Sequence, residues 1–259
     1  MNAIEIKNIS KNFDGLKAID NLSLDIPENS VFAILGPNGA GKTTVINILS
    51  MLLKPDKGTV KILGFDIMKE SKKVRELVGL TLQYACVDEA LTAKQNLLVF
   101  GQLLGLSRKE AKIRGNELLK EFNLEDAANK PIQKFSGGMR RRLDLAVSLI
   151  DRPKLIFLDE PTTGLDPRTR NQMWSTIKNL VKKGSTVLLT TQYLEEADQL
   201  SDEIAIMDEG KVIAKGTAES LKKEYKAKNL DEVFLKITGD GTDGKNNNYE
   251  ELNMIKEVV

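Results

Sequence analysis

The segment Gly36 to Thr43 constrains the fold of this chain more than any other feature. Its sequence, GPNGAGKT, fits the phosphate-loop pattern G-x-x-x-x-G-K-[ST]. A continuous apolar run over residues 31–35 precedes the loop, and Val45, Ile48 and Leu49 follow it at helical spacing. A strand, a glycine-rich loop and a helix in this order offer backbone N–H groups and a helix N-terminus to a phosphate. We therefore predict an α/β fold with a phosphate-loop NTPase core, in which helices flank a mostly parallel sheet.

Two side chains of the loop carry specific chemistry. Lys42 supplies a positive charge at the β- and γ-phosphates, and the Thr43 hydroxyl is a ligand for Mg²⁺. The glycines let the backbone wrap closely around phosphate oxygens. We expect the nucleotide to contact the whole segment, namely Gly36, Pro37, Asn38, Gly39, Ala40, Gly41, Lys42, Thr43 and Thr44.

A second motif narrows the choice among phosphate-loop proteins. Residues 154–158 are a short apolar strand that ends in two carboxylates, Asp159 and Glu160. Asp159 is placed to hold the Mg²⁺ shell, as a Walker B aspartate does. Glu160 is placed to polarise the water that attacks the γ-phosphate. We therefore predict Lys42 and Glu160 as catalytic residues, and Thr43 and Asp159 as metal ligands.

A third motif, Ser136-Gly137-Gly138, opens a helix whose apolar residues share one face. A hydroxyl and bare backbone donors at a helix start form another anion-binding construction. One nucleotide does not need two phosphate cradles from the same chain. We infer that the second cradle serves a nucleotide bound to another subunit.

Composition excludes several other kinds of site and partner. The chain has no histidine, so histidine-based zinc sites and Ser-His-Asp triads are ruled out, and its one cysteine, Cys86, cannot form an intramolecular disulfide. The net charge is +1, which gives no broad basic field, and we expect no nucleic-acid partner. No apolar run reaches the roughly 20 residues that span a bilayer, and the first residues do not resemble a secretory signal. We expect a cytoplasmic protein whose membrane part is another polypeptide.

The remaining segments suggest how the chain is organised. The alternation in residues 4–6 and 22–26 is typical of half-buried antiparallel strands, which indicates an N-terminal antiparallel β subdomain. Helical patterns dominate residues 94–134, where Ser107 and Glu110 fit a capping box, so we predict a helical subdomain inserted over about residues 94–152. We expect a single domain over residues 1–237. The polar segment 238–259 is expected to be a disordered tail rather than a partner-binding arm.

These motifs, in this order, resemble those of the ABC (ATP-binding cassette) ATPases, and the resemblance extends from about residue 3 to residue 237. Ser136-Gly137-Gly138 is similar to the signature motif of that family. The resemblance also implies that Phe13 stacks on adenine, that Gln83 contacts Mg²⁺ and senses a permease, and that Asp166 belongs to a loop that crosses a dimer interface. It implies two subunits packed head to tail, identical or different, with each ATP between the phosphate loop of one and the signature of the other.

Within the family, several stretches resemble the daunorubicin-resistance type of exporter ATPase. They include SGGMRRRL from Ser136 and TTQYLEEAD from Thr190. This similarity implies export of a hydrophobic or amphipathic compound through a separately encoded transmembrane permease, with the chain peripheral on the cytoplasmic face of the cell membrane.

One position departs from the family pattern. Most ABC ATPases have a histidine where this chain has Gln192. A glutamine can donate a hydrogen bond to the γ-phosphate, but it cannot take up a proton at neutral pH. We expect Glu160 to act as the base and Gln192 to position the reacting groups.

Two alternatives stay open. One is a nucleotide-gated ATPase that hydrolyses slowly, which Gln192 motivates. The other is a non-transport ABC ATPase acting on DNA or the ribosome, but the coiled-coil insertion or second cassette that it predicts is not in the sequence. The run Arg140 to Arg142 could suggest RNA binding, yet we interpret it as the solvated face of a helix.

Overall fold

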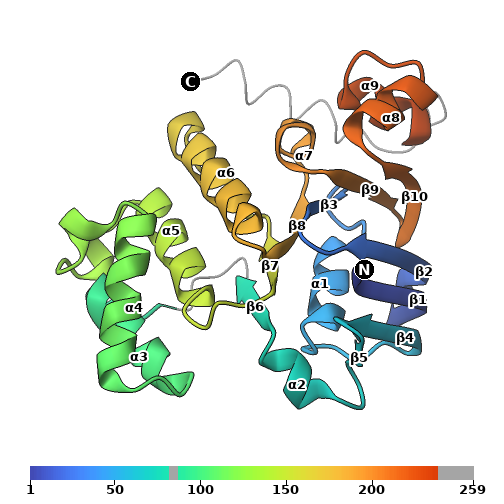
Figure 1. Ribbon diagram of the computed structural model, residues 1–259. Coiled ribbons are helices and arrows are strands. Elements are labelled where there is room, and N and C mark those ends of the chain that lie inside the picture. Colours follow the sequence, from blue (N-terminus) through green and yellow to red (C-terminus); the bar gives the residue numbers. More distant parts are fainter. Residues whose placement is uncertain (82–86, 239–259) are drawn as a thin grey trace.

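The computed structural model (Figure 1) describes residues 1–81 and 87–238. The predictions for Gln83, for Cys86 and for a tail beginning at residue 238 fall outside these ranges, apart from Thr238 itself. Within the two ranges, no helix is long and apolar enough to cross a membrane.

The N-terminal part forms a four-stranded antiparallel sheet, as the alternating pattern predicts. Its strands are β1 (Asn2–Phe13), β2 (Leu16–Pro27), β4 (Lys57–Ile62) and β5 (Phe65–Asp66), in the order β2-β1-β4-β5. Alternate residues of β1 and β2, such as Ile4, Ile6 and Leu24, are buried. One face of this sheet therefore packs on the body of the protein.

The second sheet has six strands in the order β10-β9-β3-β8-β7-β6. They are β3 (Val31–Leu35), β6 (Val78–Thr81), β7 (Leu155–Asp159), β8 (Thr186–Thr191), β9 (Glu203–Asp208) and β10 (Lys211–Gly216). Neighbouring strands are parallel except for β10, which is antiparallel to β9. The mostly parallel sheet predicted from the sequence is confirmed.

The three central strands β3, β7 and β8 are buried along their whole length, because both faces of the sheet are covered. Their residues alternate between two hydrophobic clusters. Ala33, Leu158 and Leu189 belong to the cluster shared with the helices α3 to α9, and Ile34 and Phe157 belong to the cluster shared with α1 and the antiparallel sheet. The carboxyl ends of the three strands meet at one edge, which is where the loops after residues 35, 159 and 191 emerge.

Helices cover the six-stranded sheet and extend beyond it. They are α1 (Lys42–Leu49), α2 (Ser71–Arg75), α3 (Ala93–Leu103), α4 (Arg108–Glu121), α5 (Gly137–Ser148), α6 (Pro167–Lys182), α7 (Leu194–Leu200), α8 (Ala218–Glu224) and α9 (Leu230–Thr238), with short 3₁₀ turns at Glu125–Ala127 and Ile132–Lys134. Helices α3, α4 and α5 pack on one another to one side of the sheet, beyond β6 (Figure 1). This grouping is the region predicted as an inserted subdomain; its limits at about 94 and 152 stay a prediction.

Helices α3, α4, α5, α6 and α8 begin with a side-chain cap. Thr92, Ser107, Ser136, Asp166 and Thr217 each accept a hydrogen bond from a backbone N–H in the first turn of the helix that follows. Ser107 and Glu110 form the capping box predicted from the sequence. Helix α1 differs. It follows Gly41, whose φ of 99° is left-handed, and no side chain of the described residues caps it.

Candidate functional site

The phosphate-loop segment leaves the carboxyl end of β3 and turns into α1. Glycine is sterically required at two of its positions. A Cβ on Gly36 would lie 2.3 Å from the carbonyl oxygen of Met207. Gly41 has a left-handed φ, and a Cβ there would lie 2.5 Å from the carbonyl oxygen of Ala18. Gly39 also has a left-handed φ, but open space surrounds it. The loop is therefore packed against β9 at its base and open at its tip.

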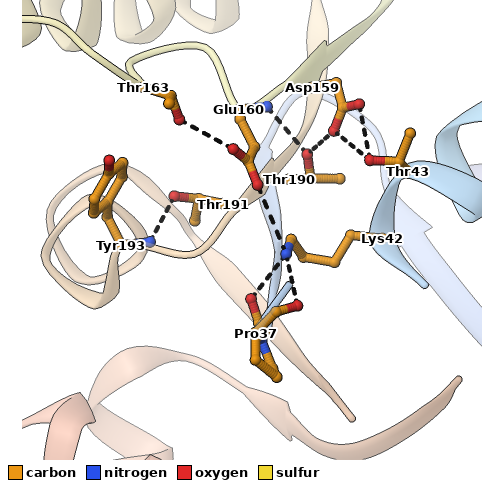
Figure 2. A network of polar contacts seen from close by, with 10 residues as sticks. Pro37, Lys42, Thr43, Asp159, Glu160, Thr163, Thr190, Thr191 and Tyr193 are labelled. Atoms are coloured by element: carbon orange, nitrogen blue, oxygen red, sulfur yellow. Dashed lines mark hydrogen bonds and ion pairs between the residues drawn. The ribbon is translucent and has the colours of Figure 1, made fainter. Parts of the chain in front are cut away.

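Lys42 lies buried under this loop. Its ammonium group donates hydrogen bonds to the carbonyl oxygens of Gly36 (2.9 Å) and Pro37 (3.0 Å), and the Glu160 carboxylate lies 3.8 Å away (Figure 2). Burial lowers the pKa of Lys42, and the nearby carboxylates of Glu160 and Asp159 oppose that shift. The ammonium is thus largely desolvated before any ligand binds, and this strengthens its attraction to an anion that enters the loop.

Asp159 ends β7 and faces Thr43. The Thr43 hydroxyl donates to one carboxylate oxygen of Asp159 at 3.0 Å, and the Thr190 hydroxyl donates to the other at 2.5 Å (Figure 2). Adjacent ligands of an octahedral Mg²⁺ with bonds of about 2.1 Å are separated by roughly 3.0 Å. The spacing of the Thr43 and Asp159 oxygens therefore fits two neighbouring positions around one such ion. The described residues contain no cluster of three or more Cys, Asp or Glu that could hold a metal alone.

Glu160 follows Asp159 in a left-handed backbone conformation, with a φ of 47°. Such a conformation is uncommon for a residue other than glycine and stores strain. Its N–H donates to the carbonyl and hydroxyl oxygens of Thr190, both at 3.1 Å. Its carboxylate accepts a hydrogen bond from the Thr163 hydroxyl (3.1 Å) and faces Lys42. The turn after β7 therefore holds this carboxylate directly beside the phosphate loop.

A cavity of about 920 Å³ opens over these groups. It brings together many of the residues predicted from the sequence, namely Phe13, Asn38, Gly39, Gly41, Lys42, Thr43, Thr44, Glu160 and Gln192. It is also lined by residues that the sequence did not single out: Leu16, Lys17, Ala18, Asp20, Thr163, Glu209 and Lys211. Phe13 is 43% exposed at its rim, where Lys11 lies over the ring at 5.6 Å. The cavity has the size of an open ligand site, with an aromatic ring at its rim and cations and carboxylates at its base.

The segment Ser136-Gly137-Gly138 lies elsewhere. None of its residues is among the described residues that line the cavity. Ser136 caps α5 by accepting a hydrogen bond from the N–H of Met139 at 3.3 Å. Gly137 has open space where a Cβ would be, whereas a Cβ on Gly138 would lie 2.7 Å from the methyl carbon of Thr169. Within one chain, the two predicted phosphate cradles do not share a site.

Gln192 follows β8, and Asp166 precedes α6. Gln192 follows β8 and lines the cavity, and the next residue, Tyr193, donates its N–H to the Thr191 hydroxyl at 3.0 Å (Figure 2). Asp166 is the N-cap of α6 and accepts hydrogen bonds from the N–H (3.0 Å) and hydroxyl (2.6 Å) of Thr169. The hydrogen bonds from Thr169 hold the pKa of Asp166 below its usual value. In the single chain, Asp166 therefore serves as a helix cap.

The interpretation of Arg140 to Arg142 as a solvated face is wrong for two of the three arginines. Arg140 pairs with Glu89 at the surface. Arg141 and Arg142 are half-buried and donate to backbone carbonyl groups, Arg142 to that of Phe122 at 3.0 Å. The sequence analysis also missed Glu196, which is fully buried on α7.

Comparisons with known proteins agree with this arrangement. The sequence profile of the family described as ABC transporter matches residues 19–163. The daunorubicin resistance ATP-binding protein DrrA3 of Streptomyces coeruleorubidus is 50% identical over 232 residues, which are 90% of this chain and 73% of that protein. The daunorubicin/doxorubicin resistance ATP-binding protein DrrA of Streptomyces peucetius is 52% identical over 85% of this chain and 67% of its own length.

Solved structures show the same fold. The ATP-binding subunit of an ABC transporter superposes with a TM-score of 0.82 at 27% identity, covering 92% of this chain and all of that one. A dimeric ATP-binding cassette in a post-hydrolysis state, bound to ADP and Pi, superposes with a TM-score of 0.76 at 29% identity, covering 83% of this chain and 98% of that one. A family profile over more than half of the chain and relatives that are half identical to it show that the chain belongs to the ABC transporter family, as an ATP-binding and ATP-hydrolysing subunit.

Proposed function

We propose that this chain is the motor subunit of an exporter of hydrophobic or amphipathic compounds, and that it hydrolyses Mg-ATP with Glu160 as the base. One observation carries the catalytic part of the proposal. The carboxylate of Glu160 lies 3.8 Å from the ammonium of Lys42, so the proposed base and the proposed phosphate ligand line one cavity.

The phosphate loop binds the nucleotide through groups that are free to change partners. The ammonium of Lys42 exchanges the carbonyls of Gly36 and Pro37 for β- and γ-phosphate oxygens. The N–H groups at the start of α1 point to the same anion. Phe13, at the rim of the cavity, offers its ring to the adenine.

Thr43 and Asp159 are the described residues that would hold Mg²⁺, and Gln83 is the third proposed ligand. The bound ion would neutralise phosphate charge that develops during hydrolysis. Mg²⁺ sites of proteins often use one or two protein ligands and are completed by substrate phosphates and water, which this small ligand set fits.

Hydrolysis then requires a base and a group that positions the reacting atoms. Glu160 accepts a proton from the attacking water, because its carboxylate faces the position that Lys42 marks for the γ-phosphate. Gln192 lines the same cavity and can donate a hydrogen bond to the phosphate. It assists without exchanging a proton.

The signature segment is proposed to complete the site of a second ATPase subunit. Its residues, Ser136, Gly137 and Gly138, begin α5 and do not line the cavity of their own chain. A head-to-tail dimer would bring each segment to the nucleotide of the other subunit. Asp166, which precedes α6, is proposed to lie at that dimer interface.

The transport role rests on the relatives. The daunorubicin resistance ATP-binding proteins are about half identical to this chain, and the Nod factor export ATP-binding protein I of Sinorhizobium fredii is 40% identical over 90% of it. We propose by analogy that the chain works at the cytoplasmic face of the cell membrane, bound to a separately encoded permease.

The test is Mg-ATP hydrolysis as a function of protein concentration, for the natural chain and for Glu160→Gln. We expect the specific activity to rise with concentration, because the complete site needs two copies. Glu160→Gln should bind ATP normally and lose about 100- to 10,000-fold in kcat. A Glu160→Gln chain that hydrolyses at the normal rate would remove Glu160 as the base.

A second candidate is a nucleotide-gated regulator that hydrolyses ATP slowly, which the glutamine at position 192 favours. It predicts a tight ATP-bound dimer with very low turnover at every protein concentration. Substituting Gln192→His separates the two functions, since a large gain in kcat would show that the natural residue limits hydrolysis.

A further inference from the structure

We propose that Arg141 is a positioning residue for Glu160, holding the turn after β7 in the conformation that presents the Glu160 carboxylate to the cavity. The inference rests on the proposed role of Glu160 as the base. Arg141 does not line the cavity and, on this proposal, acts only through the backbone of the turn.

Three hydrogen bonds of Arg141 go to three consecutive residues. Its guanidinium donates to the carbonyl oxygen of Asp159 at 2.8 Å, to that of Glu160 at 3.2 Å and to that of Pro161 at 3.0 Å. Three carbonyls in a row that point to one side chain define the path of the backbone. A guanidinium suits this task because its donors lie in a rigid plane.

The turn that Arg141 holds is the strained one. Glu160 has the left-handed φ of 47°, and its N–H donates to Thr190. A strained conformation persists only when the surrounding contacts over-determine it. Arg141 supplies these contacts from α5 and Thr190 supplies them from β8, so the peptide units around Glu160 are clamped between a helix and a strand.

The charge of Arg141 is balanced within the same region. Burial lowers the pKa of Arg141, while the carboxylates of Asp144, Asp159, Glu196 and Glu160 counter that effect. Glu196 also fixes the next part of the turn, because it accepts hydrogen bonds from Thr162 (2.7 Å) and Trp174 (3.0 Å). Arg141 therefore belongs to a buried polar network that ends at the base.

The functional consequence follows from geometry. Without the guanidinium, three carbonyls lose a donor and the strained turn can relax, which moves the carboxylate away from the attacking water. Displacement of a catalytic group by about 1 Å costs on the order of 100-fold in rate. Nucleotide binding should be spared, since the phosphate loop does not contact Arg141 in any described bond.

The experiment compares Arg141→Met and Arg141→Lys with a matched control, Arg114→Met. Arg114 is also a half-buried arginine that donates to two backbone carbonyls, those of Leu149 (2.8 Å) and Ile150 (3.3 Å), but it lies on α4 and makes no described hydrogen bond to the turn. All variants are assayed for Mg-ATP hydrolysis at saturating protein concentration. Their folding is checked by thermal melting, and their ATP affinity by calorimetry.

We expect Arg141→Met to lower kcat by about 30- to 100-fold while KM and the ATP dissociation constant stay within about twofold. Arg141→Lys keeps the charge without the planar donors, and should lose about tenfold in kcat. Arg114→Met should keep its kcat. Adding Arg141→Met to Glu160→Gln should cause no further loss, because both changes remove the same contribution.

Three results would overturn the proposal: a normal kcat in folded Arg141→Met or Arg141→Lys, a loss that appears in KM instead of kcat, or a full further loss in the double variant. If Arg141→Met fails to fold, Arg141→Lys decides alone. A slow Glu160→Gln beside a fully active Arg141→Met would reject the positioning role only. A fully active Glu160→Gln would reject the base assignment itself.

Discussion

The two helix starts predicted to bind phosphate, those of α1 and α5, are built differently. Helix α5 is capped by its own Ser136, whose hydroxyl accepts a hydrogen bond from Met139. Helix α1 follows Gly41, and across residues 1–81 and 87–238 no side chain caps it. The N–H of Val45 donates to the carbonyl oxygen of Gly41 at 3.0 Å, and the buried ammonium of Lys42 donates to the carbonyl oxygen of Gly36.

This difference indicates that the two helix N-termini have different roles in nucleotide binding. An uncapped helix start beside a desolvated ammonium has its strongest favourable interaction with an anion that enters the loop. The N-terminus of α5 is already stabilised by its cap, and the space beside Gly137 is open. It can therefore contact an anion bound to another subunit without rearranging. The phosphate loop should therefore bind ATP in a single subunit, whereas the signature segment should act only in a dimer.

Lys42→Ala and Gly137→Asp should separate these two roles. Removing the buried ammonium should weaken ATP binding by about 30- to 100-fold, since a charge-assisted hydrogen bond contributes about 2–3 kcal/mol. The aspartate has space at Gly137 and should leave ATP binding by a dilute chain unchanged, although its charge repels the phosphates of a partner-bound nucleotide. Calorimetry at low protein concentration measures both affinities. An equal loss of ATP affinity in both variants would refute these separate roles.

Mixing these two inactive variants tests whether the sites are shared. A dimer of one Lys42→Ala chain and one Gly137→Asp chain contains one site with both cradles intact. An equimolar mixture should therefore recover hydrolysis up to about one quarter of the natural rate, because half of the dimers are mixed and each has one of two sites. Each variant alone is the control. A mixture as inactive as its components would show that both cradles act within one chain.

Alanine at the two signature glycines should have opposite effects on stability. A Cβ on Gly138 would meet Thr169 at 2.7 Å, so Gly138→Ala should lower the free energy of unfolding by about 1–3 kcal/mol. Gly137→Ala meets nothing within 4 Å, and a helical alanine should raise it by about 0.5–1 kcal/mol. Chemical denaturation gives both values. If Gly137→Ala is both more stable and slower in hydrolysis, the open face is kept for the partner's nucleotide.

Phe13→Leu should have the smallest effect. Phe13 contributes an exposed ring to the rim of the cavity, away from the phosphates. Stacking of a base on an aromatic ring contributes about 1–3 kcal/mol, part of which leucine retains, so we expect a three- to tenfold weaker ATP affinity. Tripolyphosphate serves as the control ligand, because its affinity should not change. A similar loss with tripolyphosphate would mean that Phe13 shapes the loop and does not bind the base.

Local patterns predicted the strand–loop–helix unit and the carboxylates after β7. Both consist of residues adjacent in sequence, and the edge where parallel strands end brings the two motifs together. The surplus of phosphate cradles predicted that Ser136 to Gly138 would serve a nucleotide on another subunit, and this stays a prediction. Within one chain these residues do not line the cavity that contains Lys42.

Other parts of the site depend on contacts between distant segments. The sequence shows two glutamates, Glu195 and Glu196, and nothing local says that only Glu196 is buried, because its partners Thr162 and Trp174 come from another part of the chain. Likewise, three consecutive arginines look like a solvated run. Only the docking of α5 against the end of β7 turns Arg141 inward.

The shared central strands have a consequence for how the molecule unfolds. Since β3, β7 and β8 contribute alternate residues to both hydrophobic clusters, neither cluster can dissolve while the other keeps its strands. The amides of these strands should exchange with solvent deuterium only through global opening, as one cooperative unit. The phosphate loop and Glu160 are attached directly to the ends of those strands. The catalytic geometry should therefore persist until the whole core melts, so heat inactivation and loss of tertiary structure should coincide.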